Sequence, residues 1–268
     1  MRLLAFLKLP LAAALLALTA SAPAAAAEDA DLELVLAVDV SSSVDNREQI
    51  LQRRGYVAAF RDPEVIAAIT SGAFGRIAVT YVEWAGDYRK VVVPWRIIQS
   101  QSDARAFAAE LASKPISRAD LTSISRGLLF AADQFVQSPA SGLRRAIDIS
   151  GDGANNTGPP VAPTRDALVA QGITINGLPI VIQPSAITWP IGSVDLGLYY
   201  EDCVIGGAGA FTVRVEDESG FQLAIRHKLF LEIAGIAPPV ILAADDIQPR
   251  LPTDCLIGEH WFSDKHGG

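Results

Sequence analysis

The stretch from Leu34 to Ser43 constrains the fold of this chain more than any other part of the sequence. It opens with the apolar run Leu-Val-Leu-Ala-Val, which is typical of a strand buried on both faces. Asp39 ends the run, and Ser41 and Ser43 follow at alternate positions. Because open α/β sheets bind ligands at the carboxyl ends of their strands, the stretch predicts a site at that edge. Its oxygen donors suit a hard ion such as magnesium.

Strand and helix patterns alternate along residues 28–234, which predicts an α/β domain with a mostly parallel, doubly wound (Rossmann-like) sheet and helices on both faces. Residues 88–95 should return after a turn at Gly86 and Asp87 as one antiparallel edge strand, ended near Pro94. Residues 211–215 should form a last strand, and the Pro-rich tail over residues 235–268 should be non-helical.

Residues 1–27 have the layout of a secretory signal peptide. Arg2 and Lys8 give a positive start, a short apolar core follows, and small residues lead to a cleavage point after about Ala27. The core of roughly 12 apolar residues is too short for the ~20 that a spanning helix needs. We therefore expect export to the periplasm or the extracellular space, with no membrane span in the mature chain.

The net charge limits which classes of partner the protein can bind, and the cysteine content bears on whether it forms a disulfide. Without Arg2 and Lys8, 20 basic residues face 30 acidic ones, a net charge of −10. An acidic chain without a basic stripe argues against nucleic acid and anionic lipid as partners. Cys203 and Cys255 are the only cysteines. An even number in an exported chain predicts a disulfide, and two separate buried thiols are the alternative.

Two further oxygen donors follow the pattern that begins at Asp39. Thr122 precedes an expected helix in the pattern Thr-x-Ile-x-x-Gly-Leu, and Asp152 follows an expected strand and precedes Gly153. Asp39, Ser41, Ser43, Thr122 and Asp152 together resemble the metal-ion-dependent adhesion site of the von Willebrand factor type A superfamily, the fold of integrin I domains. That site combines an Asp-x-Ser-x-Ser motif, a distant threonine and an aspartate in an Asp-Gly turn. The resemblance covers residues 28–234, and residues 81–86, 149–156 and 173–178 also resemble a group of exported bacterial proteins of unknown function.

The resemblance implies a role for each donor. The Ser41 and Ser43 hydroxyls would bind Mg²⁺, with Mn²⁺ as the other possible ion, and Thr122 would bind directly or through water. Asp39 and Asp152 would hold coordinated waters. Such an ion keeps one open position, which implies a protein partner that presents an acidic side chain. One departure from the pattern is Gly151, because many relatives have threonine before the aspartate.

Each residue also has a structural alternative. Asp39 could cap a helix, Thr122 could be an N-cap and Asp152 a turn residue. Glu83 fits an outer acceptor of the site, a buried structural residue or a surface residue. Asn155 and Asn156 are expected simply to shape a loop. The tryptophans Trp84, Trp95 and Trp189 fit core or rim positions as well as a partner contact.

Three functions remain open at this level. The first is an exported binding module that captures a protein through a metal-bridged carboxylate. The second is a metal-dependent hydrolase, although no nucleophile and base constellation is recognisable and His227, His260 and His266 lie in the last helix and tail. The third is an envelope structural or assembly protein whose site only stabilises the fold.

Overall fold

The computed structural model describes residues 27–182, 195–237 and 252–266. The expected signal peptide therefore lies outside the described residues except for Ala27, and so does Trp189. In the described part, no helix combines the length and apolar character needed to cross a membrane.

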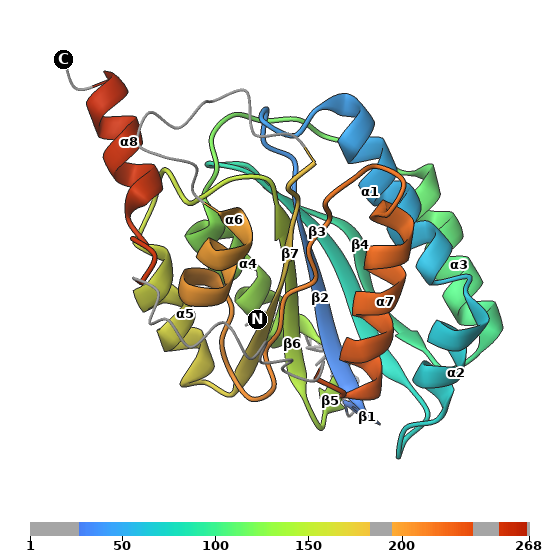
Figure 1. Ribbon diagram of the computed structural model, residues 1–268. Coiled ribbons are helices and arrows are strands. Elements are labelled where there is room, and N and C mark those ends of the chain that lie inside the picture. The colour runs from blue at the N-terminus through green and yellow to red at the C-terminus, as the bar shows by residue number, and fades with distance from the viewer. Residues whose placement is uncertain (1–26, 183–194, 238–251, 267–268) are drawn as a thin grey trace, which may run out of the picture.

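A five-stranded sheet forms the centre of the molecule (Figure 1). Three of its neighbouring pairs are parallel, and only the pair at one edge is antiparallel, as the sequence predicts. In spatial order the strands are β4 (Arg89–Ile98), β3 (Ile77–Trp84), β2 (Leu32–Asp39), β6 (Arg145–Gly151) and β7 (Ile173–Pro179). Every residue of β2 is buried because β2 lies in the middle of the sheet.

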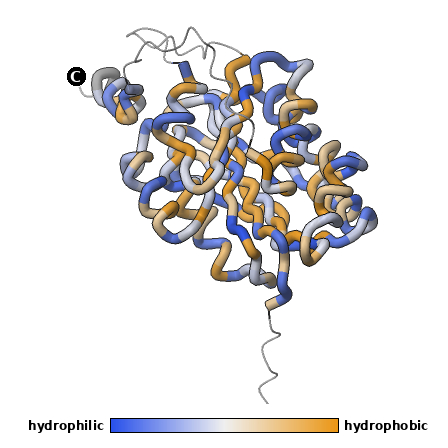
Figure 2. Tube along the Cα trace, turned by 60° about the horizontal axis from the view of Figure 1, so that its bottom comes forward, coloured by the Kyte–Doolittle hydropathy of each residue, from blue (hydrophilic) through white to orange (hydrophobic). Residues whose placement is uncertain are grey.

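Helices cover both faces of the sheet (Figure 1). Alternate side chains of β2 point to opposite faces, so Leu34 and Leu36 pack into one core cluster and Val35 and Ala37 into another. The first face carries α1 (Asn46–Ala59), α2 (Pro63–Thr70), α3 (Gln101–Ser113) and α7 (Phe221–Ala234). The second carries α4 (Ile124–Gln134), α5 (Val161–Val169), α6 (Leu196–Tyr199) and the π-helical turn η2 (Tyr200–Val204). Figure 2 shows the same layering as a hydrophobic centre with hydrophilic segments outside it.

The start of α1 follows from local sequence. The Asp45 side chain accepts hydrogen bonds from the amides of Arg47 and Glu48, and the Glu48 carboxylate accepts one from the Asp45 amide. This reciprocal capping box satisfies amides that have no partner within the helix. It begins the helix at Asn46, so only a short loop separates β2 from α1.

The structure corrects three details of the sequence prediction. Pro94 does not end β4, because the strand lies at the sheet edge, where a missing amide donor is tolerated, and its ladder with β3 shifts register between Val79 and Val82. Residues 211–215 form only isolated bridges beside β7 rather than a full strand. The tail is not wholly non-helical, since α8 spans Ile257–His266. A small parallel pair, β1 (Glu28–Ala30) with β5 (Ala140–Gly142), had no expected counterpart.

Two buried ion clusters connect helices to the sheet. Arg53 on α1 pairs with Glu83 on β3, which confirms the structural alternative for Glu83. Lys228 on α7 lies 2.6 Å from an Asp148 oxygen on β6 and also pairs with Glu232 one turn further along α7. All three side chains of this second cluster are almost fully buried.

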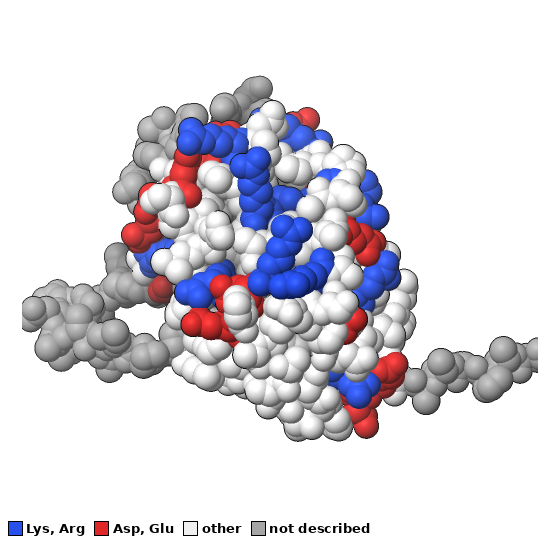
Figure 3. All heavy atoms as spheres, turned by 90° about the vertical axis from the view of Figure 1, so that its right-hand side faces the viewer, with Lys and Arg blue, Asp and Glu red and all other residues white. Residues whose placement is uncertain are grey.

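Basic side chains are unevenly distributed over the surface. Figure 3 shows Lys and Arg gathered on the side of the molecule that α1 and α3 cover. Arg54 on α1 and Arg105 on α3 are exposed there, and Arg61 follows the end of α1. The negative net charge of the whole chain conceals this local excess.

Candidate metal centre

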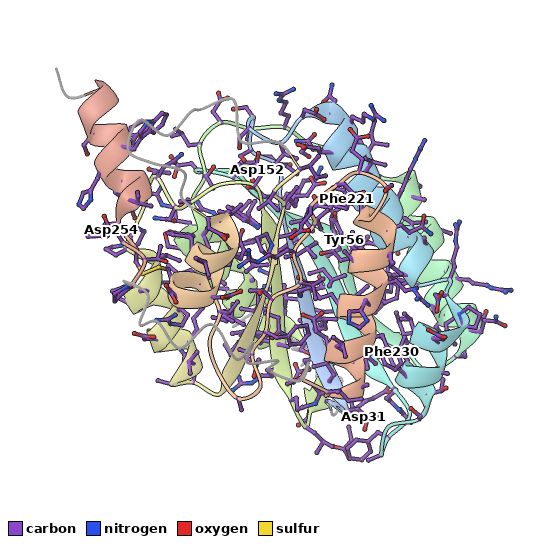
Figure 4. The ribbon with its side chains drawn as sticks, viewed as in Figure 1. Asp31, Tyr56, Asp152, Phe221, Phe230 and Asp254 are labelled. Atoms are coloured by element: carbon purple, nitrogen blue, oxygen red, sulfur yellow. A yellow bond between two sulfur atoms is a disulfide. The ribbon has the colours of Figure 1, made fainter. Side chains whose placement is uncertain are left out.

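Loops from the carboxyl ends of β2 and β6 meet at one end of the sheet. The Ser41 amide donates to Asp39 Oδ1 at 2.7 Å, and the Ser41 and Ser43 hydroxyl oxygens lie 2.9 Å apart. The Ser43 hydroxyl then donates to Asp152 Oδ1 at 2.7 Å, joining residues 109 positions apart. Figure 4 places Asp152 at the opposite end of the sheet from Asp31, which precedes β2.

Thr122 lies beside the same turn. A Cβ built on Gly153 would lie 3.6 Å from the Thr122 hydroxyl oxygen. The Thr122 amide donates to Asn156 Oδ1 at 3.0 Å, and the Asn156 amide donates to the Thr122 carbonyl at 2.9 Å. These paired bonds join the Thr122 loop to the loop after Asp152. The structure thus links Asp39, Ser41, Ser43 and Asp152 through hydrogen bonds and places Thr122 beside the residue that follows Asp152.

The two carboxyls of the site, Asp39 and Asp152, lie close together without a positively charged partner to balance them within the part of the chain that the structure describes. Asp39 is fully buried, and its Oδ2 has no hydrogen-bond partner among the described residues. Burial raises the pKa of Asp39 well above its usual range, and the charge of Asp152 raises it further. Burial also raises the pKa of Asp152 to about 6, although the hydrogen bond from Ser43 opposes the shift. A bound cation would favour the ionised form of both carboxyls.

Tyr200 is a site residue that sequence reasoning missed. A Cβ on Gly151 would lie 2.8 Å from Asp39 Oδ2 and 2.9 Å from the Tyr200 hydroxyl, so both oxygens approach the β6 backbone at this glycine. The Tyr200 hydroxyl is buried and has no hydrogen-bond partner within the described residues. Burial raises the pKa of Tyr200 well above its ordinary value, with Asp39 and Asp152 adding to the effect. A larger residue at position 151 would displace one of these oxygens, which explains the glycine.

The rim of the site carries a second missed feature. Leu121 has φ 67°, the left-handed region that β-carbon-bearing residues rarely adopt, and its side chain is 40% exposed. Its carbonyl accepts a hydrogen bond from the Gly86 amide at 2.8 Å, which holds the loop in this conformation. Strained backbone of this kind concentrates at functional sites. No sequence signal marks it, because leucine favours other conformations.

The remaining sequence expectations have plain outcomes. Cys203 and Cys255 form a disulfide with their Cα atoms 5.5 Å apart. Trp84 is a fully buried core residue, and half-buried Trp95 donates its indole N–H to the Gln134 carbonyl at 2.9 Å. In the described part of the chain, no group of three or more His, Cys, Asp or Glu side chains could hold a metal, so any ion at the β2–β6 edge would depend on hydroxyls as well as carboxylates.

Comparison with solved structures defines the class of the fold as von Willebrand factor type A. Proximal thread matrix protein 1 from the mussel byssus aligns with a TM-score of 0.55 at 17% identity, over 78% of this chain and 49% of that protein. The von Willebrand factor type A protein from Catenulispora acidiphila aligns at 0.52 and 14%, over 76% of this chain and 43% of that one. The corresponding domain of the type V pilus tip protein Mfa5 from Porphyromonas gingivalis aligns at 0.51 and 9%, over 80% and 98%. This chain therefore spans about half the length of the first two proteins.

Within that class the family is defined by sequence. Residues 29–237 match the family described as "Protein of unknown function (DUF1194)", and the chain belongs to it. A comparison with curated proteins gives no match. One structure of the mussel protein is described as having a zinc-occupied metal-ion-dependent adhesion site, which says that this fold can hold a divalent metal at such a motif.

Proposed function

We propose that this protein is an exported binding module that holds Mg²⁺, or Mn²⁺, at the β2–β6 edge and captures a protein partner through an acidic side chain. The observation that carries the proposal is the hydrogen-bonded chain from Ser41 through Ser43 to Asp152, beside the buried and partly unsatisfied Asp39. A hard cation at this point would bind the same oxygens directly, so that coordination bonds would replace the hydrogen bonds between them. It would also supply the positive charge that the two carboxyls lack.

The residues present fit a magnesium ion. The Ser41, Ser43 and Thr122 hydroxyls would hold the ion, and the two aspartates would hold its waters or contact it. Magnesium demands octahedral geometry and keeps several waters, so a sparse protein shell suits it. A centre with few charged protein ligands remains electrophilic, and a carboxylate from a partner would complete its coordination.

The structural neighbours support a role in binding outside the cell. The Mfa5 domain comes from a pilus tip protein, and another aligned structure is a pilus adhesin from Lactobacillus rhamnosus GG. The Cys203–Cys255 disulfide also fits an oxidising compartment, in keeping with the signal peptide expected at residues 1–27.

The test uses the mature protein and two matched serine variants. Titration calorimetry should show Mg²⁺ or Mn²⁺ binding to wild type, and loss of binding in Ser41→Ala with Ser43→Ala. Ser42→Ala is the control, because Ser42 is exposed and lies between the two proposed ligands. A partner protein that the immobilised wild type captures from the native envelope fraction in magnesium should elute when EDTA is added.

Two results would count against this function. Absence of metal uptake at millimolar concentrations would remove the metal centre. Turnover of phosphoesters in magnesium, lost in Asp152→Ala, would instead identify a metal-dependent hydrolase.

A further inference from the structure

The C-terminal helix α8 lies outside the matched family residues 29–237 and is nevertheless attached to the domain. The Cys203–Cys255 disulfide links the residues just before α8 to η2 on the second face of the sheet. The Thr253 amide donates to Asp202 Oδ2 at 3.1 Å next to this bridge. Figure 1 shows α8 at the periphery of the molecule, on the same side of the sheet as α5 and α6.

Two residues of α8 contact the loop that carries Asp152. The Asn155 side-chain amide donates to Glu259 Oε1 at 2.7 Å. The backbone of Gly258 packs so closely on Asn155 that a Cβ at position 258 would collide with the Asn155 carbonyl oxygen. Glycine at 258 thus permits the helix to approach the loop, and Glu259 accepts its hydrogen bond there.

Asn155 is the residue through which this contact can reach the metal centre. It is fully buried, and its Oδ1 accepts hydrogen bonds from the Ser125 amide at 3.1 Å and the Ser125 hydroxyl at 3.2 Å. The backbone amide of Asn155 donates to the Tyr199 hydroxyl at 3.1 Å. The next residue, Asn156, forms the paired bonds with Thr122. Through these hydrogen bonds Asn155 joins the loop after Asp152 to three helices, namely the start of α4, α6 and α8.

We propose that α8 is a clamp, anchored by the disulfide, that holds the loop carrying Asp152 and Asn155 in place. In this proposal Glu259 is a positioning residue for Thr122 and Asp152. The proposal rests on the proposed function for its metal-binding consequence. Glu259 does not contact the proposed ion. Together with the Pro159 carbonyl, which lies 3.2 Å from the same nitrogen, it accepts from the Asn155 side-chain amide and so holds the side chain that joins the two loops supplying the ligands. Groups that orient metal ligands from outside the coordination sphere affect metal affinity by about 10–100-fold.

The first experiment measures the metal-free protein, so it does not depend on metal binding. Amide hydrogen exchange is followed for Ser125 and Asn156, whose N–H groups donate across the loop contacts. Glu259→Ala should speed exchange at both amides by about tenfold, whereas Glu259→Gln, which keeps an oxygen acceptor, should leave both near wild type. His260→Ala is the control, because this α8 side chain is 63% exposed and contacts Asp254 rather than Asn155.

A merely structural role for Glu259 gives a different pattern. If the side chain only anchors α8, exchange should rise within α8 or throughout the protein, and the Ser125 and Asn156 amides should show no local increase. Unchanged exchange at these two amides in Glu259→Ala would overturn the clamp whatever the metal-binding result.

The second experiment measures metal affinity. Glu259→Ala should weaken Mn²⁺ binding by about tenfold and Glu259→Gln by much less. Cys203→Ser with Cys255→Ser, or Gly258→Ala, should have the same direction of effect, since each prevents α8 from reaching Asn155. Metal binding by wild type with equal affinity in Glu259→Ala would refute the clamp alone. Wild type that binds no metal would refute the proposed function, and the exchange experiment would then decide the clamp separately.

Discussion

Replacing Glu232 with Gln should remove a pH-dependent weakness from the core. Glu232 is buried on α7 and shares the Lys228 ammonium with Asp148 on β6. Burial raises the pKa of Glu232 from 4.5 to about 7, the charge of Asp148 adds to the shift, and Lys228 opposes it. One ammonium thus serves two buried carboxyls.

The sign and the size of the effect follow from linkage. Between pH 4.5 and about 7 the folded protein keeps a proton on Glu232 that the unfolded chain has released, so the free energy of unfolding falls as pH rises through this window. The pKa difference corresponds to a loss of about 3 kcal/mol. Glutamine cannot ionise and should escape that loss. The free energy of unfolding of Glu232→Gln minus that of wild type should therefore rise by about 3 kcal/mol between pH 4.5 and 8.

Urea unfolding of both proteins at pH 4.5, 6 and 8 measures this difference. Comparing the change with pH cancels any fixed cost of fitting the glutamine amide at this buried position. Asp133→Asn, an exposed acid on α4, is the matched control and should show the wild-type profile. Parallel pH profiles for Glu232→Gln and wild type would refute the assignment of a raised pKa to this cluster.

Three other outcomes test the core and the site. Lys228→Met should lower the free energy of unfolding at pH 8 by roughly 3–5 kcal/mol, because two buried carboxyls lose their cation; urea unfolding with less than 1 kcal/mol of change would contradict this. Magnesium at a hundred times its Kd should raise the free energy of unfolding of wild type by about 2.7 kcal/mol and leave Asp152→Ala unchanged in calorimetry. Gly151→Ala should cost roughly 1–3 kcal/mol and weaken metal binding, since the new methyl group meets Asp39 Oδ2 and the Tyr200 hydroxyl; a variant with wild-type melting and affinity would show that these oxygens can move freely.

The sequence predicts the features that depend on local pattern. The apolar run before Asp39 indicates a strand in the middle of a parallel sheet, because both of its faces must be buried. The positions of Asp39, Thr122 and Asp152 at the ends of strands and the start of a helix indicate that they share one edge. Each of these inferences needs only the residues within one element and the rule for where parallel strands end.

Features that depend on contacts between distant segments are not visible in the sequence. Tyr200 carries no motif, and only the fold brings its hydroxyl to the glycine before Asp152. Pro94 looks like a strand terminator until the strand is known to lie at an edge. The short helical pattern of residues 257–266 is hidden by the prolines before it, and its position depends on the disulfide to Cys203.

The central position of β2 has a consequence for the order in which the strands of the sheet can pair. Its two sheet neighbours are β3, which follows within about 50 residues, and β6, which is complete only at Gly151. During synthesis, β2 would therefore have one side unpaired until more than half of the polypeptide had been made. The proposed ion site shares this dependence, since Asp152 follows β6 directly. Uptake of a divalent ion would then report that the sheet has closed around its middle strand.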